Sequence, residues 1–349
     1  MRRARHATLR LVPLLAGLGL GGPLDARPFT DAAGRTVAVP ERPARILAAG
    51  PPASVLLYTL APDRMVGWIR SPTPEEKLFL APATRDLPVT GRLTGRGGTA
   101  NVEAVLGLAP DLILDVGSTA PTYVSLADRV QAQTGIPYVL LDGHFEKTAE
   151  SYRRLGALLG LESAAADLAG ASEAAVADVA RVIATVPEER RPRVYYARGP
   201  KGLETGLGGS INVELLGVVG ARNVAAAGPG GIATVSPEQV LAWDPDVILT
   251  QDAGFRRGIA QDPLWSGLRA VRAGRVYQVP ALPFGWFDAP PGANRLIGIR
   301  WLAQVLYPDL FSTGLEAATR DFYRRFYHVD LDDGQVAALL SGAAPGPKP

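Results

Sequence analysis

Cations and aromatic rings that follow predicted buried strands are the side chains best suited to bind a ligand in this sequence. In an open parallel sheet, ligands bind at the carboxyl ends of the strands. Guanidinium groups bind carboxylates and oxyanions through paired hydrogen bonds, and aromatic rings stack on planar groups. The pattern predicts a site for a bulky anionic ligand, although the same residue types also pack lobes against each other. The candidate contact residues are Ser54, Arg92, Ser118, His144, Tyr196, Arg198, Lys201 and Trp286.

Catalytic constellations are scarce in the same sequence. It contains three histidines, His6, His144 and His328, and no cysteine, which excludes a zinc site built from His and Cys side chains. GxxxxGK[ST] and GxSxG motifs are absent, and GLGLGG at 17–22 follows no predicted strand. His144 and Asp142 could form an acid–base pair, but a loop pair of this kind is more often structural. We therefore expect a binding protein with no catalytic residues, no metal ligands and no cofactor.

One segment of thirteen residues occurs twice. VEAVLGLAPDLIL at 102–114 and PEQVLAWDPDVIL at 237–249 share seven identical positions, whereas random pairing would give roughly one. Each copy reads as a short helix, a proline turn and a buried strand. We infer two α/β lobes of one design. The alternative is a chance similarity, because helix–Pro-Asp–strand is a common local pattern.

Each copy of the repeat has a glutamate in the first turn of its predicted helix, Glu103 and Glu238. Asn101 and Ser236 precede them as candidate N-caps, and a carboxylate at this position interacts favourably with the helix dipole. That structural role alone explains the glutamates. The functional alternative is that two matched carboxylates on one surface bind arginines of a pseudo-symmetric partner.

The elements that must position these residues follow from hydrophobic periodicity. Apolar runs of four to six residues alternate with helical patterns, which indicates βα units around parallel sheets. A hairpin is predicted at 29–39, and both halves of the chain then run in the same order. Predicted strands lie at 45–50, 65–69, 135–142, 193–199 and 274–280, and predicted helices at 53–61 and 210–220. The fold class is α/β, with two Rossmann-like lobes of parallel-rich sheet and a ligand cleft between them.

The predicted organisation has five parts: a signal peptide at 1–26, an N-terminal lobe at 27–146, a connecting helix at 147–186, a C-terminal lobe at 187–330 and a tail at 331–349. The connector is alanine-rich with apolar residues at helical spacing. The signal peptide has a basic start, a short apolar core and a cleavage site near Ala26. The alternative to cleavage is an anchor. We expect a periplasmic protein.

Charge and cysteine content restrict the partners. The formal net charge is +2, and removal of 1–26 would leave −1, which gives no support for a nucleic-acid partner. Without cysteine the chain has neither disulfides nor the lipidated cysteine of a bacterial lipoprotein. We therefore expect a soluble monomer.

Several motifs in fixed order carry a family resemblance. They are FTDAAGRTVAVPERPARIL, ANVEAVLGLAPDLIL, NVAAAGPGGIATVSPEQ with VSPEQVLAWDPDVIL, and DPLWSGLRAVRAGRVYQVP. With them the chain resembles the periplasmic substrate-binding proteins of ABC importers for iron–siderophore complexes, haem and cobalamin. The resemblance covers roughly residues 28–328.

The resemblance implies two lobes joined by a long helix, limited closure over the ligand, and a permease dimer as partner that is contacted through Glu103 and Glu238. GPKGLETG at 199–206 and PFGWFDAPPGANRL at 283–296 resemble a subgroup that handles iron chelates or oxyanions such as molybdate. The expected function is capture of a ferric siderophore-like chelate for an importer. Haem, cobalamin or an oxyanion are alternative ligands, and a chelatase-like enzyme on the same scaffold is an alternative of another class.

Overall fold

The computed structural model describes residues 26–94, 102–228 and 230–341. The predicted signal peptide up to residue 25, Asn101 and the end of the predicted tail lie outside these residues. Within the described ranges, no helix has both the length and the apolar character needed to cross a membrane.

The N-terminal lobe begins with the predicted hairpin, in which β1 (Ala26–Thr30) and β2 (Thr36–Pro40) pair antiparallel. A parallel sheet follows in the order β3-β4-β5, with β4 at its centre. The remaining elements of this lobe are β3 (Ile46–Ala48), α1 (Pro51–Leu60), α2 (Pro74–Lys77), α3 (Val102–Gly107), β4 (Leu112–Gly117), α4 (Pro121–Thr134) and β5 (Tyr138–Asp142).

The strand predicted at 65–69 is not a regular strand. Met65 and Trp68 form isolated bridges, to Ile46 and Val89 respectively. Trp68 N–H donates to the carbonyl of Pro88, and proline has no N–H with which to continue a ladder. The segment therefore stays a loop between two partners.

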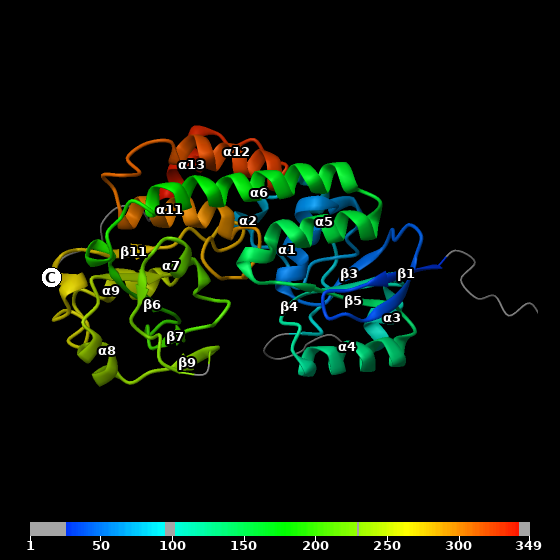
Figure 1. The fold of residues 1–349 in the computed structure, drawn as a ribbon, viewed down its shortest axis with the longest axis horizontal. Coiled ribbons are helices and arrows are strands. Elements are labelled where there is room, and N and C mark those ends of the chain that lie inside the picture. Colours follow the sequence, from blue (N-terminus) through cyan, green and yellow to red (C-terminus); the bar gives the residue numbers. More distant parts are fainter. Residues whose placement is uncertain (1–25, 95–101, 229, 342–349) are drawn as a thin grey trace, which may run out of the picture.

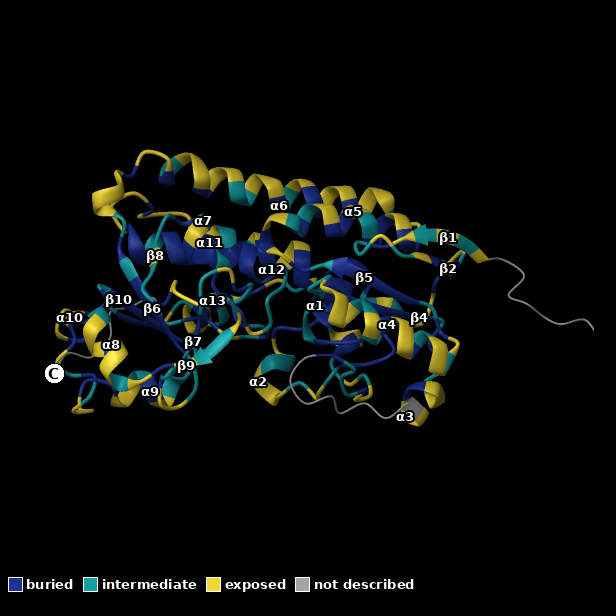
Figure 2. Ribbon diagram, turned by 60° about the horizontal axis from the view of Figure 1, so that its bottom comes forward, coloured by how far each residue is buried: buried dark blue, intermediate teal, exposed yellow. Residues whose placement is uncertain are grey.

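The C-terminal lobe has a parallel sheet in the order β11-β10-β6-β8 and a separate two-stranded antiparallel sheet of β7 and β9. The strands of both parallel sheets are largely buried, as predicted from their apolar runs (Figure 2), except for the edge strand β8. The elements are β6 (Arg193–Ala197), β7 (Glu204–Gly206), α7 (Glu214–Val218), β8 (Arg222–Asn223), β9 (Ile232–Thr234), α8 (Pro237–Trp243), β10 (Val247–Thr250), α9 (Ala253–Gly258), α10 (Arg269–Arg272), β11 (Val276–Gln278), α11 (Arg295–Leu306), α12 (Leu315–Tyr327) and α13 (Asp333–Leu340).

The repeated segment forms the same unit in both lobes. In each, a short helix leads through a proline turn into an inner strand of the sheet, β4 or β10. The aspartate after the proline accepts a backbone N–H from the start of the neighbouring strand: Asp111 from Arg45, and Asp246 from Arg193. Each arginine donates in return to two carbonyls at the end of the helix. The residue before the proline has a positive φ in both copies, 45° at Ala109 and 35° at Asp244.

The predicted connecting helix is two helices, α5 (Thr148–Leu159) and α6 (Glu162–Ile183). Gly160 ends α5 with φ of 67°, a left-handed conformation that breaks the helix. The two helices pack side by side, and Gly156 makes this approach possible because a Cβ there would lie 2.3 Å from the Cβ of Ala165. Only α6 extends over both lobes (Figure 1).

The C-terminal helices return to the first lobe. Helix α12 packs on α1 as well as on α11, and Tyr58 in α1 donates from its hydroxyl to the carbonyl of Tyr327, 2.5 Å away. The predicted tail contains helix α13, whose Val336 and Leu339 are buried. One hydrophobic core cluster therefore includes residues of both lobes, the connector and the C-terminal helices.

Candidate functional site

A cavity of about 520 Å³ lies between the two lobes. The first lobe contributes α1, the loop around residue 70, α2 and Arg92, while the second contributes Gln251 and the loop after β11. Apolar, aromatic and proline side chains make up most of its wall. The lining residues are Pro51, Ser54, Trp68, Ile69, Arg70, Pro72, Glu76, Leu80, Arg92, Gln251, Ala281, Pro283, Phe284, Gly285, Ala289 and Pro290.

The start of helix α1 forms one wall of the cavity. Gly50, the N-cap residue, supplies no side-chain cap, and Pro51 and Pro52 follow it without backbone N–H groups. Ser54 lines the cavity in the first turns of α1 and is only 4% exposed. Its hydroxyl oxygen has no hydrogen-bond partner among the described residues. An unpaired buried hydroxyl is unfavourable unless a ligand or a water molecule bonds it.

Two arginines, Arg70 and Arg92, line the cavity. Arg70 donates two hydrogen bonds, of 2.7 and 2.5 Å, to the two oxygens of Glu76, and this contact raises the pKa of Arg70. Glu76 also accepts the N–H of Thr73 in a capping box that begins α2. The charge of Arg70 is thus largely neutralised. Arg92 is the second cationic side chain among the lining residues.

The segment that carries Arg92 is fixed to the first sheet. The backbone N–H groups of Leu93 and Thr94 both donate to the carbonyl of Ala49 at the end of β3. The Thr94 hydroxyl donates to Asp115, a buried carboxyl whose pKa is raised by desolvation. These contacts explain how a residue outside a regular strand reaches the cleft.

The wall that the second lobe contributes is supported by the buried carboxylate of Asp288. Its oxygens accept the Tyr196 hydroxyl at 2.6 Å, Asn212 at 2.9 Å and Gln251 at 3.1 Å, and form an ion pair with Arg198. Burial nevertheless raises the pKa of Asp288. This network lies behind the cavity wall and orients Gln251, which lines the cavity.

The structure brings Ser54 and Arg92 to the cavity, but it places the predicted aromatic contacts elsewhere. Trp286 is 0% exposed, and its indole N–H donates to the hydroxyl of Tyr323. Tyr196 is also buried and bonds Asp288, and Arg198 stands beside it in the same network. In this structure these three residues shape the wall and do not line the cavity.

The other predicted contacts lie outside the cavity. Ser118 follows β4 and accepts the N–H of Ala120. Lys201 is exposed beyond β6. His144 is exposed after β5 and bonds Asp142 through Nδ1 at 2.6 Å, which raises the pKa of His144.

Sequence reasoning missed part of the first wall. Trp68, Arg70 and Glu76 come from a loop and a short helix, so the rule that ligands gather at strand ends gives no signal for them. Phe284 and Gln251 lie in segments that this rule does select, yet their residue types did not single them out. A Trp followed by an arginine beside a proline-rich loop was the available signal.

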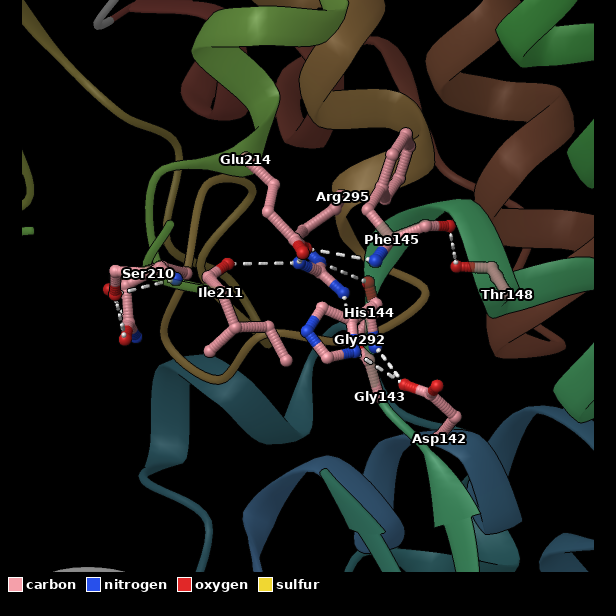
Figure 3. A network of polar contacts seen from close by, with 12 residues as sticks. Asp142, Gly143, His144, Phe145, Thr148, Ser210, Ile211, Glu214, Gly292 and Arg295 are labelled. Atoms are coloured by element: carbon pink, nitrogen blue, oxygen red, sulfur yellow. Dashed lines mark hydrogen bonds and ion pairs between the residues drawn. The ribbon is translucent and has the colours of Figure 1, made fainter. Parts of the chain in front are cut away.

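A second polar network joins the lobes beside the connector (Figure 3). Arg295 of α11 is 1% exposed and bonds the carboxylate of Glu214 at 2.9 Å. It also donates to the carbonyl of Gly143 at the end of β5 in the first lobe, at 2.8 Å. Glu214 in turn accepts the N–H of Phe145. Arg295 and Glu214 thus hold the first lobe against α7 and α11.

Glu103 and Glu238 are exposed, and they belong to different lobes. Ser236 caps α8 and forms a capping box with Gln239. Hydrogen bonds from the backbone and from Ser236 lower the pKa of Glu238, which keeps it ionised. In Figures 1 and 2, α3 and α8 both lie on the side of the molecule away from α6.

Comparison with known proteins agrees with this architecture. Residues 48–282 match the family described as periplasmic binding protein. A cobalamin-binding protein of Halobacterium salinarum is 30% identical over 310 residues, covering 79% of this chain and 77% of its own. The molybdate-binding protein MolA of Haemophilus influenzae is 34% identical over 155 residues, which span 44% of this chain and 43% of MolA.

Solved structures match over nearly their whole length. An ABC transporter solute binding protein from Sulfurospirillum deleyianum has a TM-score of 0.82 at 29% identity, covering 90% of this chain and 99% of that one. MolA bound to molybdate has a TM-score of 0.73 at 25% identity, covering 88% and 99%. The family match, the long alignments and the two-lobed fold agree, and the chain therefore belongs to the periplasmic binding proteins of ABC importers.

Proposed function

We propose that this chain captures a metal chelate with an anionic organic shell, of the ferric siderophore type, and delivers it to an inner-membrane ABC permease. The observation that carries the proposal is the cavity between the lobes. Its volume of about 520 Å³ is in the range of sites for organic ligands, which are mostly apolar with a few polar groups that fix orientation.

The polar groups of the cavity suit negatively charged oxygen atoms of such a cargo. Arg92 supplies positive charge, and the Ser54 hydroxyl lies on the cavity wall near the start of α1. Trp68 and Phe284 can cover the organic part of the chelate by stacking. The cargo would therefore bind with its charged oxygens towards α1 and Arg92 and its planar groups towards the aromatic side chains.

An oxyanion such as molybdate is the second candidate, because MolA is similar in both sequence and structure. A small tetrahedral anion could use Ser54 and Arg92, but it would leave most of the apolar wall uncovered. Cobalamin is a further candidate through the similarity to the cobalamin-binding protein. Haem is another, because its planar ring could stack on the aromatic side chains of the wall. The proposal treats the protein as a receptor without enzymatic activity.

The partner in this proposal is a permease dimer with one arginine-lined pocket on each half. Glu103 and Glu238, at equivalent positions of the repeat, would each bind one pocket. A double Glu103→Ala, Glu238→Ala variant should bind its cargo normally and fail in transport. Normal transport by that variant would remove the docking role.

Native mass spectrometry with metal analysis, on protein purified from its own periplasm, tests the cargo. A bound organic molecule that contains iron and is not haem would support the proposal. Bound molybdate, haem or cobalamin would instead identify that molecule as the cargo. If the protein is empty, a thermal-shift screen with ferric catecholates, ferric hydroxamates, molybdate, haem and cobalamin gives the same decision. Turnover of a tetrapyrrole by the purified protein would instead show a chelatase-like enzyme.

A further inference from the structure

The repeat contains two exposed leucines that the fold does not explain. Most of its seven identical positions have structural roles in both copies: the valine, isoleucine, leucine and proline of the core, and the aspartate that binds the neighbouring strand. The exceptions are the glutamate and the leucine three residues after it. Leu106 and Leu241 are each 45% exposed.

A single exposed leucine on a protein surface is ordinary. Here a leucine is exposed to the same extent, 45%, at equivalent positions of α3 and α8. Residues three apart on a helix lie on the same face. Each helix therefore places a leucine beside its glutamate: Leu106 beside Glu103, and Leu241 beside Glu238.

The two helices lie at separate ends of the molecule on the side opposite to α6 (Figure 2). A partner that contacts both must have two equivalent surfaces that far apart, each with a cation for the carboxylate and an apolar pocket for the leucine. A two-fold symmetric membrane protein has this property. Interfaces commonly combine buried apolar anchors with charged groups at the rim.

We propose that Leu106 and Leu241 are apolar anchors of the contact with the permease dimer, one for each half. This rests on the proposed function, in which the glutamates beside them bind the same partner. The two pairs of residues then have different roles. The carboxylates speed association and make it dependent on salt, whereas burial of the leucines slows dissociation.

The test measures binding to the cognate permease–ATPase complex in lipid nanodiscs, at low and at physiological ionic strength. We expect Leu106→Ala with Leu241→Ala to weaken binding about tenfold, mainly through faster dissociation, with an unchanged salt dependence. Glu103→Gln with Glu238→Gln should instead slow association and flatten the salt dependence. The matched control replaces two exposed leucines outside the repeat, Leu78→Ala with Leu310→Ala, and should bind like the wild type.

The outcomes separate the two proposals. Loss of binding in the glutamate variant, with wild-type kinetics in the leucine variant, overturns the anchor role alone. Absence of binding by the wild type, or wild-type kinetics in both variants, overturns the docking model and the anchors with it. Thermal unfolding and cargo binding of every variant should match the wild type. A dimer of this chain that dissociates on substitution of the leucines would assign them to a second copy and overturn the proposal.

Discussion

At the scale of single residues, Ser54 combines an unfavourable environment with a position on the cavity wall. Its hydroxyl is buried without a partner among the described residues, and such a group costs about 1–3 kcal/mol. Ser54→Ala should therefore stabilise the ligand-free protein by about 1 kcal/mol and weaken cargo binding. Calorimetry of the empty protein and titration with the identified cargo measure the two effects. A stabilised variant with normal affinity would show that Ser54 does not contact the cargo.

His144 gives a pH dependence with a definite sign. Its hydrogen bond to Asp142 raises the pKa of His144 in the folded protein. The stabilisation is therefore complete below the unfolded-state pKa of about 6.5 and is lost as pH rises through the higher folded-state pKa. As pH rises between these two values, the free energy of unfolding of the wild type should fall by a few tenths of a kcal/mol, whereas that of His144→Gln should not change. The effect is small because the pair is solvent-exposed. Urea unfolding at a series of pH values checks this.

At the scale of elements, the contact between α5 and α6 depends on Gly156. A Cβ there would lie 2.3 Å from the Cβ of Ala165, so Gly156→Ala must separate the helices and should cost about 1–3 kcal/mol. Gly170→Ala in α6 is the matched control, because a Cβ added at position 170 would have no other atom within 4 Å. That substitution should stabilise by about 0.5–1 kcal/mol through helix propensity. Chemical denaturation of both variants decides whether close approach matters at 156.

The elements that could be predicted are those with strong local patterns. Both copies of the repeat were predictable because their identical valines, prolines and aspartates satisfy the same buried positions and strand contacts. The break at Gly160 and the loop at 65–69 were not, because each depends on its neighbours: α5 must turn back along α6, and Pro88 prevents a ladder. Residues 331–349 were predicted to be a tail, but residues 333–340 form helix α13.

The residues that line the cavity could be predicted only in part, because their positions also depend on tertiary neighbours. The strand-end rule found Ser54 and Arg92, since the chain leaves the first sheet near both. It also selected Tyr196 and Trp286, whose rings face the interior because Asp288 and Tyr323 offer their polar atoms buried partners. Residue type indicates what a side chain can bind, but tertiary contacts decide which side of a wall it occupies.

At the scale of the whole molecule, Arg295 and Glu214 couple the lobes. Arg295→Met should destabilise by about 3 kcal/mol, because it leaves Glu214 without its cation and the carbonyl of Gly143 without its donor. A double-mutant cycle with Glu214→Gln, measured by urea unfolding, should give a coupling energy above about 1 kcal/mol. Additive effects would show that the two residues act independently.

The return of α12 to α1 has a consequence for the order in which the polypeptide matures. Tyr58 reaches its partner Tyr327 across 269 positions, so the interior of the first half stays incomplete until nearly the entire chain has been synthesised. One face of the first lobe's sheet has a buried cluster made only of residues from that lobe. The opposite face shares its cluster with α12, so a chain that ends before this closing helix should leave that face exposed to water.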